Sequence, residues 1–72
     1  MKRYIIAVKR EHRSKAMANW FEPLRDIKDL QIRGTSNTFR IQVDATDEAI
    51  EAARHMLGDL CHIEPAIPHR FV

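Results

Sequence analysis

The residues that could perform nucleophilic or metal chemistry are few and scattered. The chain has four histidines and one cysteine, and of these only Cys61 and His62 lie close together, with Glu64 beside them. Successive side chains of an extended strand point to opposite faces, so Cys61 would point away from the other two, which disfavours a metal site. We therefore expect Cys61 to be a small buried hydrophobic residue. We expect no catalytic activity, no bound metal and no cofactor.

Other reactive side chains have structural explanations. Ser14 follows a charged connection and is better placed to cap a helix than to act as a nucleophile. Asp47 and Glu48 fall in the first turn of a predicted helix, where the helix dipole favours acids. Two glycines in the whole chain are too few for a glycine-rich phosphate loop. The remaining candidate is a local cluster of basic residues. Such a cluster is more readily explained as solvated surface charge than as an anion-binding site. Its members are Lys9, Arg10, Arg13 and Lys15.

Length and composition predict one small domain that spans residues 1–72. A hydrophobic content of 44% and a charged content of 31% are typical of a globular protein. A domain of this length has too small an interior for a deep catalytic cavity. Its net charge of +2 is too mild to require a nucleic-acid partner, which is therefore disfavoured.

The composition also favours a cytoplasmic protein without a membrane partner. The single cysteine excludes an internal disulfide, which fits a reducing compartment. The N-terminal apolar run, from Tyr4 to Val8, is too short for a signal peptide and no small-residue cleavage site follows it. No segment approaches the length of a membrane span.

Hydrophobic periodicity predicts four strands and two helices. The strands are expected at residues 3–9, 30–34, 38–44 and from about 60 to 64, with a turn at 35–37 between the second and third. A first helix is expected to begin at Ser14, because Met17, Phe21 and Leu24 recur at helical spacing, and Pro23 is expected to kink or end it. A second helix is expected over residues 46–57, with Gly58 ending it.

The element order β-α-β-β-α-β predicts a ferredoxin-like α+β sandwich. In this fold two helices cover one face of a four-stranded antiparallel sheet whose first and third strands lie in the middle. The other face of the sheet is left open as a docking surface with a small apolar centre and a polar rim. Its expected centre is Ile5 and Ala7, and its expected rim is Arg33, Arg40, Gln42, His62 and Glu64.

The C-terminus is expected to leave this body, which spans about residues 2–64, as a tail over residues 65–72. Pro65 and Pro68 lack an N–H group and fix φ, so they suit an extended segment and not an inner strand. The sequence leaves two interpretations open, a terminal segment that folds back or frays and an extended arm that binds a partner. The residues of the arm would be Ile67, Pro68, His69, Arg70, Phe71 and Val72.

The whole chain resembles the propeptide domains of subtilisin-type serine proteases and their free-standing inhibitor relatives. The matching segments are residues 4–9 as the first strand, residues 39–45 before the second helix, and Ile63 and Glu64 leading into the tail. The resemblance implies that the open sheet face packs on the protease, that Glu64 caps protease helices, and that residues 67–72 occupy the active-site cleft like a product. Tails of that family commonly carry a second acid where this chain has Ala66.

Three functions from different classes follow from these observations. The first is an inhibitor or folding helper of a subtilisin-like protease, which acts by occupancy. The second is a regulatory module that forms a homo-oligomer through the open sheet face. The third and weakest is binding of nucleic acid or another anion. It is the weakest because the outward positions of the third strand lack the aromatic side chains that RNA-binding relatives of this fold need. The basic residues that would bind the anion are Lys9, Arg10, Arg13, Lys15, Arg33 and Arg40.

Overall fold

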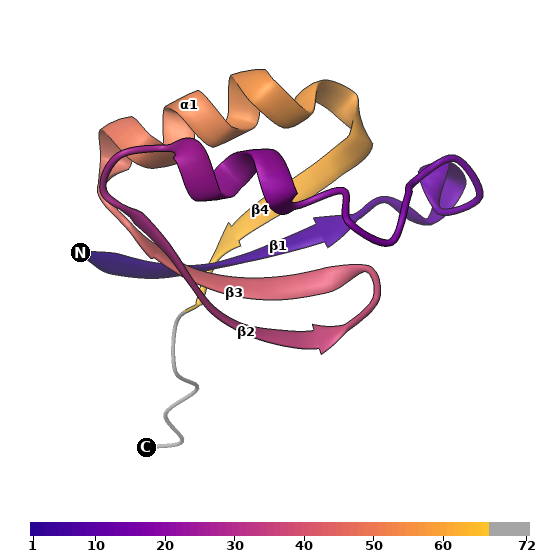
Figure 1. Cartoon of the computed structure of the whole chain (residues 1–72), viewed down its shortest axis with the longest axis horizontal. Coiled ribbons are helices and arrows are strands. Elements are labelled where there is room, and N and C mark those ends of the chain that lie inside the picture. Colours follow the sequence, from indigo (N-terminus) through magenta and orange to yellow (C-terminus); the bar gives the residue numbers. More distant parts are fainter. Residues whose placement is uncertain (67–72) are drawn as a thin grey trace, which may run out of the picture.

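The computed structural model of the chain describes residues 1–66, apart from the side chains of Ser36 and Asn37. It has an α+β architecture in which four strands form one antiparallel sheet (Figure 1). The elements follow in the order β1 (Lys2–Val8), the 3-10 helices η1 (Arg10–His12) and η2 (Glu22–Asp26), β2 (Leu30–Asn37), β3 (Arg40–Ala45), α1 (Asp47–Leu57), the 3-10 helix η3 (Gly58–Leu60) and β4 (Cys61–Pro65).

The sheet has the strand order β2-β3-β1-β4, and every neighbouring pair is antiparallel. Strand β1 is apolar on both faces, which suits a central position between two other strands. Ile6 of β1, whose side chain lies in the core, has Ile41 of β3 and Ile63 of β4 at the paired positions on either side. The prediction that the first and third strands form the middle of the sheet is confirmed.

Helix α1 begins and ends where its sequence signals predict. The Thr46 hydroxyl accepts a hydrogen bond from the backbone N–H of Ala49 at 3.2 Å, which satisfies one of the free donors at the start of the helix. Gly58 follows the last helical residue with a φ of +56°, a conformation that side chains with a Cβ disfavour. These two residues limit the helix to Asp47–Leu57.

The expected first helix is not formed, so the prediction of two α-helices was wrong. The segment between β1 and β2 consists of turns and of the 3-10 helices η1 and η2. Pro23 lies in the first turn of η2, where its missing N–H is tolerated, and it cannot continue an α-helical hydrogen-bond ladder from the preceding residues. Trp20 gives a further reason, since its indole N–H donates to the carbonyl of Thr38 at 2.8 Å and its ring is buried. Met17, expected to face the core, is 70% exposed.

The β2–β3 hairpin is longer than predicted. Strand β2 extends to Asn37, and the turn falls at Thr38 and Phe39 instead of at residues 35–37. Two register shifts within β2 accommodate the additional residues. Phe39 therefore lies in the turn, where it is half-buried against the core, and not in the inward row of β3.

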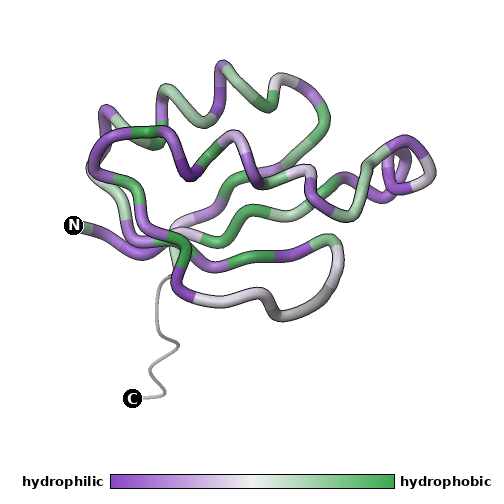
Figure 2. Tube along the Cα trace, viewed as in Figure 1, coloured by the Kyte–Doolittle hydropathy of each residue, from purple (hydrophilic) through white to green (hydrophobic). Residues whose placement is uncertain are grey.

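The core lies between α1 and η2 on one side and a single face of the sheet on the other (Figure 1). Its most deeply buried members are Ile6 and Val8 of β1, Ile41 and Val43 of β3, and Leu24 of η2. Figure 2 shows hydrophobic and hydrophilic residues alternating along β3, as a strand with one covered face requires. The opposite face of the sheet is covered by no other element in residues 1–66.

Candidate functional site

The strand register places two apolar residues at the centre of the uncovered sheet face. Ile5 lies between Gln42 of β3 and Glu64 of β4. Ala7, two residues further along β1, has Arg40 and His62 at the corresponding positions of those strands. Ile5 and Ala7 are both half-buried in the absence of a partner. The face thus has a small apolar centre with polar side chains on two sides, the arrangement that the sequence predicts.

Arg33 belongs to a different group of residues on the same face. Its Nε atom lies 3.3 Å from Asp44 Oδ2, and Arg3 Nε lies 3.1 Å from Asp44 Oδ1. Asp44 therefore bridges two arginines, and only 23% of its side chain is exposed. Sequence reasoning missed Arg3 and Asp44 as members of this face, although their spacing from Ile5 and Gln42 in an alternating pattern could have found them.

Glu64 occupies the end of β4 on the open face. Its Oε1 atom lies 2.7 Å from Nε2 of His62, and both side chains are mostly exposed, at 59% and 61%. Its second oxygen, Oε2, has no hydrogen-bond or ion-pair partner among the described residues, so it is available to a partner's N–H groups. The combination provides an acid held in place by a histidine on the same strand.

The described chain ends beside this acid. The backbone N–H of Ala66 donates to the carbonyl of Arg3 at 2.9 Å, which extends the pairing of β4 with β1. Pro65 and Ala66, the first two residues of the predicted tail 65–72, therefore continue the pairing of β4 with β1, and Pro65 lies opposite Tyr4. The predicted binding arm follows these two residues in the sequence. Its residues, Ile67, Pro68, His69, Arg70, Phe71 and Val72, lie outside the described part of the chain.

The side chain of Cys61 lacks the chemistry of a nucleophile. It is 8% exposed, and its burial raises the thiol pKa to about 11, although the nearby charge of Lys9 acts in the opposite direction. The thiol is thus protonated near neutral pH, when the thiolate is the reactive form. Within residues 1–66 no group of three or more metal-binding side chains is found.

Tyr4 also titrates above its ordinary range. Its hydroxyl donates to Asp47 Oδ1 at 3.0 Å, and this hydrogen bond is the main reason why the pKa of Tyr4 is raised. Lys2 lies 3.6 Å from the same carboxylate oxygen. These residues connect the start of β1 to the first turn of α1 and have a structural role.

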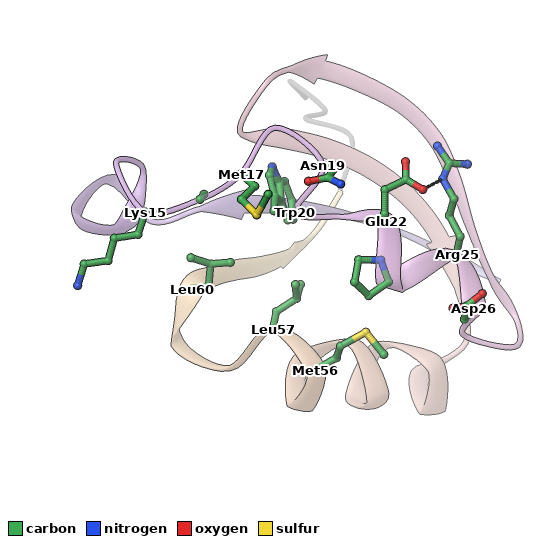
Figure 3. Close-up of a pocket in the computed structure, with 12 residues that line it drawn as sticks. Lys15, Met17, Asn19, Trp20, Glu22, Arg25, Asp26, Met56, Leu57 and Leu60 are labelled. Carbon is green, nitrogen blue, oxygen red and sulfur yellow. Dashed lines mark hydrogen bonds and ion pairs between the residues drawn. The ribbon is translucent and has the colours of Figure 1, made fainter.

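A groove lies on the helical side of the sheet. This groove, of about 740 Å³, separates the last turn of α1 from the segment that precedes and includes η2 (Figure 3). Lys15 lies at one end of the groove and Asp26 at the other. Its walls are mainly apolar, so it offers contact area and no reactive group: Met17, Trp20, Pro23, Met56, Leu57 and Leu60.

The predicted basic cluster surrounds the end of β1. Lys9 directly follows the strand, Arg10 belongs to η1, and Arg13 and Lys15 follow it. The guanidinium of Arg13 lies 5.5 Å from the centre of the Phe39 ring, which brings the cluster next to the β2–β3 turn. Arg40 begins β3 directly after that turn, so the structure adds it to the cluster.

Comparison of the chain with protein-family models, with curated proteins and with solved structures finds no match. Of the helices in residues 1–66, none is both long and apolar enough to cross a membrane.

Proposed function

We propose that this chain is a non-catalytic binding domain that inhibits, or assists the folding of, a subtilisin-type serine protease. The observation that carries the proposal is the position of Glu64, which lies on the uncovered face beside Ile5 and shortly before the predicted arm in the sequence. The inferred framework is a ferredoxin-like fold in which the first helical connection is reduced to turns and 3-10 helices. The central positions of β1 and β3 and the helix between β3 and β4 support this inference.

Binding in this proposal depends on three parts of one surface. Ile5 and Ala7 supply the apolar centre, which a partner would bury completely. Glu64 supplies a carboxylate that can accept hydrogen bonds from the free N–H groups at the start of a partner's helices. Residues 67–72 supply an extended segment whose backbone would pair with the protease cleft.

The test is a titration of a panel of subtilisin-like proteases with the full chain, with a chain lacking residues 67–72, and with Glu64→Gln. The full chain is expected to inhibit at least one enzyme, and the truncated chain is expected to lose inhibition while its circular dichroism spectrum stays unchanged. Glu64→Gln is expected to weaken inhibition by roughly 5- to 30-fold, which corresponds to about 1–2 kcal/mol for a helix-capping contact.

Glu48→Gln is the matched control, because Glu48 is an exposed acid in the first turn of α1, on the other side of the sheet. This variant should inhibit as the full chain does. The proposal is wrong if every enzyme of the panel digests the full chain without being inhibited. Loss of folding on removal of residues 67–72 would instead assign the tail a structural role.

A further inference from the structure

Ion pairs divide the cations of residues 1–66 into two groups. Lys2, Arg3, Arg25, Arg33 and Arg54 each lie within 3.6 Å of a carboxylate oxygen. The other cations form no ion pair with a described residue, and all of them except Lys28 lie at one end of the sheet. We call this group the basic end: Lys9, Arg10, Arg13, Lys15 and Arg40.

Three segments of the chain meet at the basic end. The backbone N–H of Lys9 donates to the carbonyl of Leu60 at 2.9 Å, and that of Val8 donates to the carbonyl of Phe39 at 2.8 Å. These bonds hold the end of β1 between η3 and the β2–β3 turn. The loop that contains η1 projects beyond the strands (Figure 1), and hydrophilic residues dominate it (Figure 2).

The charge at this end is strongly unbalanced. Among the described residues of these segments, Glu11 and Asp59 are the only acids that accompany the five cations. The small net charge of the chain therefore hides a local excess of positive charge, because four acids pair with lysines or arginines elsewhere in the described chain: Glu22, Asp44, Asp47 and Glu51. A localised excess of this kind attracts a polyanion even when the whole molecule is almost neutral.

We infer that the basic end binds the phosphate backbone of nucleic acid without reading its sequence. Three of its five cations are arginines, and each planar guanidinium group can donate two parallel hydrogen bonds to the oxygens of one phosphate. Base stacking is not provided, because Arg13 lies over the Phe39 ring and Trp20 is buried.

The probe is a fluorescein-labelled 20-nucleotide oligothymidine, and binding is followed by fluorescence anisotropy between 50 and 200 mM NaCl. If about four phosphates are contacted, the affinity is expected to fall roughly 50-fold over this range. The double variant Arg10→Gln/Arg13→Gln should bind more weakly at 50 mM salt. It should lose only about sevenfold in affinity over the same range, since about two contacts remain.

The control double variant is Arg25→Gln/Arg54→Gln, which removes the same formal charge from two arginines that are paired with Glu22 and Glu51. It should bind as the unaltered chain does. Arg13→Lys keeps the charge beside Phe39 and should retain the salt dependence. Circular dichroism checks that all variants are folded.

Three results would overturn the inference. One is an absence of binding at 50 mM salt, or binding that does not respond to salt. Another is an equal loss of affinity in the two double variants, which would show that total charge and not the basic end controls binding. The last is tighter binding to polyglutamate or to vesicles containing phosphatidylserine than to the oligonucleotide. Arg10 and Arg13 lie outside the open sheet face, so protease titration of the same variants remains an independent experiment.

Discussion

Cys61 illustrates how burial controls the chemistry of one residue. Because burial raises its thiol pKa from 9.0 to about 11, the unfolded chain loses this proton at a lower pH than the folded chain does. The protonated thiol therefore contributes its full stabilisation of the folded state below pH 9, and this contribution is lost as the pH rises towards 11. We expect the free energy of unfolding to fall by about 2 kcal/mol from this group between pH 8 and pH 10.5.

The measurement is urea denaturation of the unaltered chain and of Cys61→Ala at both pH values. Cys61→Ala should be less stable at pH 8, since it loses a buried side chain, but its stability should fall less on going to pH 10.5. The raised pKa of Tyr4 adds a loss in the same direction to both proteins, so their difference isolates the thiol. Equal pH dependence in the two proteins would show that the thiol is not buried in the folded state.

The segment between β1 and β2 provides a direct test at the scale of an element. If it formed the helix that the spacing of its apolar residues predicts, Met17 and Trp20 would both contact the core. In the folded chain Met17 is 70% exposed, whereas Trp20 is buried and donates a hydrogen bond to Thr38. We expect Trp20→Ala to destabilise the chain by about 3–5 kcal/mol and Met17→Ala to change its stability by less than about 0.5 kcal/mol.

Thermal and urea denaturation of the two variants measure this difference. Unfolding of Trp20→Ala at room temperature would agree with the expectation, because a domain of this length has little stability to lose. A cost above 2 kcal/mol for Met17→Ala would support the helical packing of this segment and contradict the arrangement of turns.

Local sequence signals predicted the elements whose interactions are local. The Thr46 cap and Gly58 define α1, and the alternation of apolar residues defines the strands and their inward faces. The position of the Trp20 ring could not be predicted in this way, because its hydrogen bond to Thr38 connects distant parts of the chain. The same reason applies to the candidate site. The alternation of inward and outward side chains along the strands predicted Ile5, Ala7 and their neighbours. The bridge from Arg3 through Asp44 to Arg33 could not be predicted in this way, because it depends on the pairing of three strands.

At the scale of the whole molecule, the open face and the basic end differ in charge, although Arg40 belongs to both. The open face contains both signs of charge, and most of these charges are paired, as in the contacts of Asp44 with Arg3 and Arg33. The basic end has one predominant sign and no ion pair with a described residue. The two proposals therefore involve different kinds of partner. The open face would bind a folded protein with a complementary surface, and the basic end would bind a polyanion.

The oligomeric state distinguishes a docking face for another protein from a face for self-association. Self-association would depend on the small apolar centre of the open face, Ile5 and Ala7, whereas in the proposed complex the protease also contacts Glu64 and residues 67–72. Stable dimers generally bury about 800 Å² on each partner with a larger apolar core. We expect sedimentation equilibrium at several concentrations to give the monomer mass of 8.4 kDa. A dimer that forms at micromolar concentration and dissociates in Ile5→Arg, but not in Met17→Arg, would assign the open face to self-association and favour a homo-oligomeric module over the protease-binding domain.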